Sequence, residues 1–184
     1  MLEAKKLKFI YCIAIAAISA GFGVLLYVQE KISIEQALVL LVFISLLALA
    51  CKSDFDTRTI DFKLSYMLIL VGLFYQIAGM DIKLVIKAIA TAVLCLILLI
   101  ICSMILNKST SKESLGRGDL RTMPSIALVL NYLVCFTSLF AACLISLIAI
   151  FIFQKITKRK LENFPFCPVI FLWLSIGLLF LNIV

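Results

Sequence analysis

The sequence contains no histidine, and only 10 of its 184 residues are aspartate or glutamate. Without histidine there is no Ser–His or Cys–His nucleophile pair and no histidine-based metal site. The seven cysteines include no Cys-x-x-Cys pair, and most lie in apolar runs, where a thiol behaves as a small hydrophobic group. We therefore expect no metal and no cofactor, and the few carboxylates are the remaining candidates for chemistry.

Polar residues are scarce in general, because 65% of the residues are hydrophobic. A soluble domain is about 45 to 50% apolar, whereas a membrane-spanning helix needs about 20 mostly apolar residues. The apolar stretches predict an all-α, polytopic membrane protein of about six to seven transmembrane helices. The stretches are 9–28, 36–51, 64–80, 84–106, 132–154 and 165–184, with a shorter one at 120–130.

The basic residues are distributed unevenly among the predicted loops. All of the 17 Lys and Arg residues except Lys31, Lys83 and Lys87 fall in the N-terminal tail or in every second loop. Because cytoplasmic loops collect basic residues, we expect a cytoplasmic N-terminus and a C-terminus on the outer side. The net charge of +7 then predicts contact with anionic lipid headgroups. It does not indicate nucleic-acid binding, since no basic stripe carries interleaved aromatic residues.

Four acidic residues lie beside apolar stretches on the side predicted to be cytoplasmic. Asp54, Asp56 and Asp61 belong to "CKSDFDTRTID", which follows the stretch 36–51, and Asp119 belongs to "GRGD", which precedes the stretch 120–130. An ionisable group at the edge of hydrocarbon is costly and usually faces the bundle interior or a wet cavity. Two carboxyl groups that share a water can hydrolyse a peptide bond, one as base and one as acid.

Glycines flank the last of these acids. Gly116 and Gly118 have no Cβ, so the backbone there can adopt unusual dihedral angles and approach an extended substrate closely. An unwound peptide in a membrane needs hydrogen-bond partners, which such a loop could supply by strand-like pairing. The alternative is an ordinary loop with Asp119 as the N-cap of the next helix. The four residues "GRGD" taken alone favour this alternative.

Three sequence blocks favour the functional interpretation of "GRGD" over the ordinary loop. They are "SDFDTRTIDFKLSY", then "GRGDLR", then "FPFCPVIFLW". In this order they resemble the motifs of the type IV prepilin peptidase family of intramembrane aspartic proteases, the GxGD proteases. The chain departs from the family pattern at Asp61, where the family has proline, at Arg121, where it has lysine, and at Cys167, where it has glycine. The matching residues are Asp54, Arg58 and Ile60 in the first block, Gly116, Gly118, Asp119 and Arg121 in the second, and Pro165, Phe166 and Pro168 in the third.

The resemblance covers residues 36–184, which it identifies as an intramembrane aspartic protease core, and leaves residues 1–35 as a tail with an additional transmembrane helix. It implies that Asp54 and Asp119 are catalytic. Asp56 lies two residues after Asp54, and side chains at that spacing on a helix point apart, so it becomes a substrate-binding residue. The other residues that the resemblance implies for substrate binding are Gly116, Gly118, Arg121, Pro165, Phe166 and Pro168.

The implied function is cleavage of the leader peptide of prepilin-like substrates, after a glycine, at the cytoplasmic face of the cell membrane. The substrate would carry a basic leader followed by an apolar helix. Larger bifunctional members of the family have a cytoplasmic insertion with two Cys-x-x-Cys pairs and also methylate the new N-terminus. This sequence lacks the insertion, so we expect a peptidase without methyltransferase activity.

Two other functions stay open. Acids at the membrane edge can also carry protons in a transporter, which would use Asp54 and Asp119 in alternating access. Against this, the sequence shows no paired halves and the acids lie at one face. A pilus-assembly scaffold that has lost catalysis is the third possibility, because function changes on a fixed fold.

Overall fold

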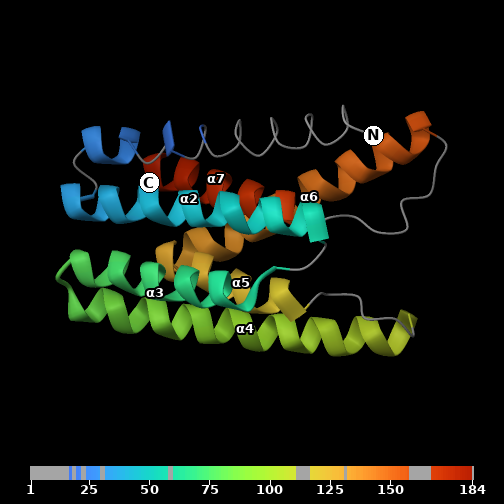
Figure 1. Cartoon of the computed structure of the whole chain (residues 1–184), viewed down its shortest axis with the longest axis horizontal. Coiled ribbons are helices and arrows are strands. Elements are labelled where there is room, and N and C mark those ends of the chain that lie inside the picture. Colours follow the sequence, from blue (N-terminus) through green and yellow to red (C-terminus); the bar gives the residue numbers. More distant parts are fainter. Residues whose placement is uncertain are drawn as a thin grey trace.

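A computed structural model describes residues 17, 20–21, 24–29, 32–57, 60–110, 117–130, 132–157 and 167–183 of the chain (Figure 1). Within these ranges the secondary structure is helical and contains no strand, which confirms the all-α prediction. Of the predicted stretch 9–28, only residues 17, 20–21 and 24–28 are described, and they are helical. The remaining helices are α2 (Ile34–Thr57), α3 (Phe62–Ala78), α4 (Ile82–Thr110), α5 (Arg117–Val129), α6 (Tyr132–Thr157) and α7 (Cys167–Ile183).

The apolar character of these helices suggests a membrane protein. Among the described residues, the segments Ile34–Asp54 of α2 and Ile82–Met104 of α4 are long and apolar enough to cross a bilayer. Large apolar side chains also point outward from α3, α4 and α6, among them Leu70, Phe74, Ile86 and Phe140. So much exposed apolar surface is rare on soluble monomers. The number of membrane spans, six to seven, stays a prediction.

Local hydrogen bonds fix where helices begin. At the start of α2, the Ser33 hydroxyl accepts a hydrogen bond from the Gln36 backbone N–H (3.2 Å), and the Ser33 N–H donates to Gln36 Oε1 (3.1 Å). This reciprocal pair is a capping box. Before α4, Asp81 Oδ1 accepts from the Lys83 N–H at 2.8 Å. Each such cap stabilises a helix by about 1 kcal/mol.

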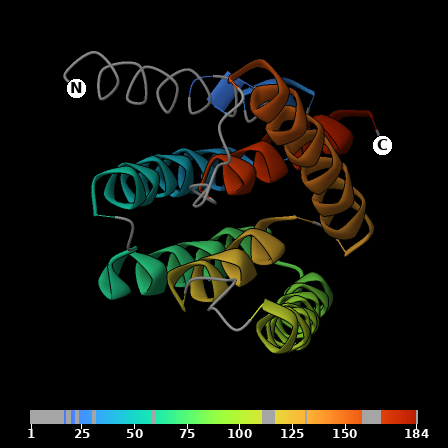
Figure 2. The same ribbon diagram turned by 90° about the vertical axis from the view of Figure 1, so that its right-hand side faces the viewer.

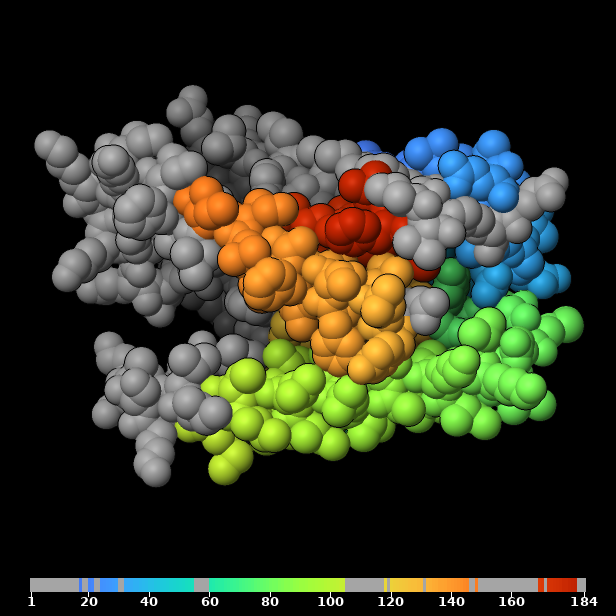
Figure 3. Space-filling model, turned by 180° about the vertical axis from the view of Figure 1, so that it is seen from behind, coloured from blue at the N-terminus to red at the C-terminus, as the bar shows by residue number. Residues whose placement is uncertain are grey.

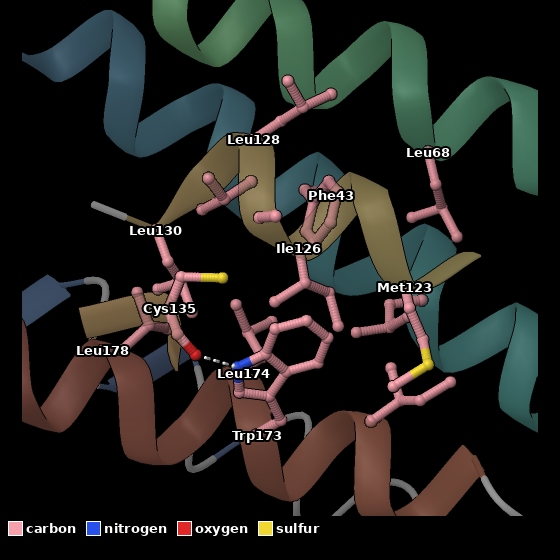
Figure 4. Packing of buried hydrophobic residues seen from close by; sticks show 14 of the residues in the cluster. Phe43, Leu68, Met123, Ile126, Leu128, Leu130, Cys135, Trp173, Leu174 and Leu178 are labelled. Carbon is pink, nitrogen blue, oxygen red and sulfur yellow. Dashed lines mark hydrogen bonds between the residues drawn. The ribbon is translucent and has the colours of Figure 1, made fainter. Parts of the chain in front are cut away.

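The short helix α5 lies in the middle of the molecule. Residues 122–130 are all buried, and α5 packs against α3 and α4 in both ribbon views (Figures 1 and 2). Figure 4 shows Met123 and Ile126 of α5 in one cluster with Phe43 of α2 and Trp173 of α7. Because apolar neighbours surround α5 on every side, it can be only 13 residues long and still be held firmly.

Helices α6 and α7 complete the bundle around this cluster. The Trp173 indole N–H of α7 donates a hydrogen bond to the backbone carbonyl of Cys135 in α6 at 2.9 Å (Figure 4). On the back of the molecule, α6 forms the surface between α7 and α4 (Figure 3). The buried indole therefore ties α7 to α6 through a satisfied polar group.

A small residue permits the close approach of α3 to α5. A Cβ at Gly72 of α3 would lie 3.1 Å from Leu128 Cβ and 3.1 Å from the Ser125 carbonyl oxygen of α5. Small residues at such crossings are typical of helix packing in membranes. In addition, the Gln76 side-chain amide donates to the Leu128 carbonyl. Together, these two contacts fix the register of α5 against α3.

Among the cysteines whose side chains the structure describes, one departs from the prediction of free thiols. Cys95 and Cys135 are free thiols buried in the core, as expected of small hydrophobic residues. Cys102 and Cys143 are free and exposed. Cys51, on α2 one turn before Asp54, is disulfide-bonded, which no spacing in the sequence indicates.

Candidate active site

The first candidate acid lies on the last turns of α2. This helix continues to Thr57, beyond the predicted end at residue 51, so Asp54 and Asp56 are both helical. Asp54 is buried, with 9% of its surface exposed. The side chain of Asp56 lies outside the described residues. A carboxyl group buried at a helix end is the kind of ionisable group that usually serves a function at a membrane edge.

The turn after α2 leads into α3 through Ile60 and Asp61. Asp61 is the N-cap of α3, and its side chain accepts a hydrogen bond from the Lys63 N–H at 3.2 Å. Its backbone angles are φ −60° and ψ 133°, and a proline requires φ close to −65°. The proline found here in the family that the sequence resembles would therefore fit the same turn. Asp61 thus departs from the motif at a position whose φ a proline could also adopt.

The second candidate acid lies at the start of α5. This helix begins at Arg117, so Gly118 and Asp119 belong to its first turn and not to a preceding loop. Asp119 is thus not the N-cap, and that alternative is wrong. No glycine in the described part of the chain has a positive φ, so Gly118 is not needed for an unusual backbone conformation. The side chain of Asp119 lies outside the described residues.

Gly118 is needed instead for a close contact with the turn after α2. A Cβ at position 118 would lie 3.0 Å from Ile60 Cβ and 3.3 Å from the Ile60 backbone nitrogen. Ile60 is buried, so it has little room to move away. The first two sequence blocks, one carrying Asp54 and the other Asp119, therefore meet at this point.

Two further contacts join the same segments. The Arg121 guanidinium of α5 lies 4.8 Å from the centre of the Phe62 ring at the start of α3, a cation–π geometry. Deeper in the bundle, Ser65 Oγ of α3 and Thr122 Oγ1 of α5 lie 3.2 Å apart and are buried. Each hydroxyl also lies near the backbone carbonyl four residues earlier, Thr122 Oγ1 at 2.9 Å from Gly118 O and Ser65 Oγ at 3.5 Å from Asp61 O, and either hydroxyl can be the donor in the pair. The start of α5 is therefore held against the start of α3.

The structure thus describes part of the predicted site. It gives the side chains of Asp54 and Arg121 and the position of Gly118. For Asp56, Asp119 and Pro168 it gives the backbone alone, in α2, α5 and α7. Gly116, Pro165 and Phe166 lie outside the described residues. The distance between the Asp54 and Asp119 carboxyl groups stays a prediction, as do the substrate-binding roles.

Sequence reasoning missed Ser65 and Thr122, the buried hydroxyl pair that fixes α3 against α5. The sequence spacing could have indicated them. Thr122 lies three residues after Asp119, and Ser65 lies four residues after Asp61, so in each case the hydroxyl lies one helical turn beyond an acid of the motif blocks. The described residues contain no group of three or more Cys, Asp or Glu side chains that could hold a metal ion.

These features define a helical protein whose two acid-bearing segments meet at one end of the bundle and whose long apolar helices suggest a membrane protein. Residues 41–152, more than half of the chain, match the type IV leader peptidase family. The chain therefore belongs to this family, which confirms the resemblance and implies a peptidase that acts on prepilin-type substrates. The matched range contains the first two motif blocks and ends before the third. No curated protein and no solved structure gives a significant match.

Proposed function

We propose that this protein is a membrane-embedded aspartic endopeptidase in which Asp54 and Asp119 form the catalytic pair. The observation that carries the proposal is the contact between Ile60 and Gly118, where a Cβ on the glycine would come within 3.0 Å of Ile60 Cβ. It links the end of α2 to the first turn of α5 directly beside Asp119. Family membership supports a peptidase and gives no support to the transporter that the acids alone leave open.

In the proposed reaction the two carboxyl groups share one proton, because close carboxylates cannot both ionise cheaply. The ionised carboxylate takes a proton from a water, whose oxygen attacks the carbonyl carbon of the scissile peptide bond. The protonated carboxyl donates a hydrogen bond to the developing oxyanion. When the C–N bond breaks, a carboxyl group gives its proton to the leaving amine, and the pair is left with one proton as before.

The helical end of α2 supports Asp54 over Asp56 as the catalytic residue. Because α2 is continuous through Thr57, the two side chains point about 200° apart, and only one can face Asp119. Asp54 is buried, with 9% of its surface exposed, whereas the structure does not describe the exposure of the Asp56 side chain. We assign Asp56 to contact with the basic leader of the substrate, together with the substrate-binding residues named from the motifs: Gly116, Gly118, Arg121, Pro165, Phe166 and Pro168.

The distribution of basic residues supports cleavage at the cytoplasmic face. Fourteen of the 17 Lys and Arg residues, all but Lys31, Lys83 and Lys87, fall in the N-terminal tail and the loops that the sequence assigns to the same side as Asp54 and Asp119, and basic residues collect in cytoplasmic loops. A prepilin-like leader is basic and would stay on that side while its apolar helix enters the bilayer. We propose cleavage after the glycine that joins these two parts.

The proposal is tested by incubating the purified protein in detergent with a panel of prepilins and reading the mature N-terminus by mass spectrometry. We expect cleavage after the leader glycine and an unmethylated amine, since the sequence has no insertion with Cys-x-x-Cys pairs. An added methyl group would contradict the single activity. Failure to cleave any leader would favour the inactive scaffold.

A further inference from the structure

The helix ends opposite to the candidate active site enclose a cavity of about 390 Å³. Its lining residues belong to the end of the bundle where α3 turns into α4, which is on the left of Figure 1, whereas the end of α2 and the start of α5 point to the other side. Its walls come from the starts of α2, α4 and α6 and the ends of α3, α5 and α7. Sites for small molecules have volumes of about 300 to 1,000 Å³, so the cavity is large enough to hold a ligand.

Two hydrogen-bond donors with no protein acceptor line this cavity. Tyr75 of α3 is only 5% exposed, and among the described residues its hydroxyl has no hydrogen-bond partner. Lys87 of α4 also lines the cavity and forms no ion pair with an acid in the described ranges. Both groups line the cavity, and Lys87 is an exposed residue. They can therefore donate to a ligand there, and the ammonium group favours one with negative charge.

Exposed apolar side chains of α4 adjoin the cavity. Leu84 both lines the cavity and is 48% exposed, and Ile86 beside it on α4 is also exposed. The inner wall is apolar as well, formed by Leu26, Ala88, Val129, Val134 and Leu181 among others. A ligand that enters across such a surface comes from the bilayer and must itself be amphiphilic.

We propose that this cavity binds one anionic phospholipid. Its phosphate accepts hydrogen bonds from Lys87 and from the Tyr75 hydroxyl, and the start of an acyl chain lies along the apolar wall. Lysine and tyrosine near helix ends lie at the depth of lipid headgroups, because the charged or polar tip reaches water while the stem stays in hydrocarbon. This site is separate from the general contact of cytoplasmic basic loops with anionic headgroups, and it is independent of the proposed catalysis.

The test compares lipid binding by the full-length wild type and three variants in detergent, read by native mass spectrometry and by the shift of thermal unfolding. The probes are phosphatidylglycerol, phosphatidylcholine and glycerol 3-phosphate. Lys87→Gln should weaken phosphatidylglycerol binding about tenfold or more, since a charge-assisted hydrogen bond is lost. Tyr75→Phe should weaken it several-fold. Lys83→Gln is the matched control, on the same helix but outside the cavity lining, and should bind as the wild type does.

Equal retention of phosphatidylglycerol by Lys87→Gln and the wild type would overturn the site. Equal binding of phosphatidylcholine would overturn its preference for an anionic lipid. Binding of glycerol 3-phosphate as tight as that of the lipid would replace the lipid by a soluble anion. Retention of the same lipid after Lys83→Gln but not after Lys87→Gln supports the proposal, and because binding is read without substrate, the result does not depend on peptidase activity.

Discussion

Gly118→Ala introduces a methyl group into the contact that joins the first turn of α5 to the turn after α2. The new Cβ would lie 3.0 Å from Ile60 Cβ and 3.3 Å from the Ile60 nitrogen, closer than carbon and nitrogen atoms normally pack. Both Ile60 atoms are fixed to the backbone, so no side-chain rotation relieves the contact. The two segments must move apart by a few tenths of an ångström.

The size of the effect follows from two opposing contributions to the free energy of unfolding. Overpacking a buried contact costs about 1 to 3 kcal/mol, whereas alanine is favoured over glycine in a helix by up to about 1 kcal/mol. The net destabilisation of about 0 to 3 kcal/mol leaves the protein folded. Catalysis is more sensitive, since a shift of about 1 Å in a reacting group costs about 100-fold. Because the two segments move by only a few tenths of an ångström, we expect kcat/KM for cleavage to fall about tenfold.

The assay is prepilin cleavage by purified enzyme, measured as kcat/KM, with thermal unfolding in detergent measured in parallel. Gly21→Ala is the matched control, because a Cβ at that position has no heavy atom within 4 Å. Adding Ile60→Gly to Gly118→Ala removes the nearest atom and should restore part of the activity. Unchanged cleavage by Gly118→Ala, or an equal loss in Gly21→Ala, would refute the claim that this contact positions the site.

Three other substitutions test the packing that supports the site, each by thermal unfolding in detergent. Trp173→Phe removes the 2.9 Å hydrogen bond to the α6 backbone and should destabilise by about 1 kcal/mol, and an unchanged midpoint would contradict this. Asp61→Ala removes the N-cap of α3 and should lower the free energy of unfolding by about 1 kcal/mol. Asp61→Pro should be nearly neutral, because φ −60° suits proline and proline lowers the entropy of the unfolded chain. Equal losses in the two variants would disprove this turn geometry. Ser65→Ala and Thr122→Val should be non-additive by about 0.5 to 1.5 kcal/mol in a double-mutant cycle, and additive effects would exclude the buried pair.

Hydropathy predicted the helices well and their polar ends less well. The stretch 64–80 corresponds to α3 at Phe62–Ala78, and 132–154 to α6 at Tyr132–Thr157, because apolar runs of this length bury their backbone groups by forming helices. The end of α2 was predicted too early, since "SDFD" continues the helix without any apolar residue except Phe55. The start of α5 was predicted too late, at residue 120, because the first residues of the helix, from Arg117, are polar or glycine.

Contacts between segments were beyond sequence reasoning. The motif blocks indicated that Asp54 and Asp119 act together, but nothing in either block identified Ile60 as the partner of Gly118 or Ser65 as the partner of Thr122. The pattern along one helix defines which face is buried, and it does not define which residue of another helix that face meets. The Lys87 and Tyr75 cavity was missed for the same reason, since its walls come from several helices.

The central claim, that Asp54 and Asp119 form a catalytic pair, is tested most directly by cleavage of a co-expressed prepilin. Asp54→Asn and Asp119→Asn should each reduce processing by at least about 100-fold, because an amide can serve neither as base nor as acid, while the protein stays in the membrane. Asp56→Asn should keep at least some activity, since a side chain two residues along α2 points away from Asp54 and contacts the leader without taking part in proton transfer. Full processing of the prepilin by Asp119→Asn or Asp54→Asn would contradict the account.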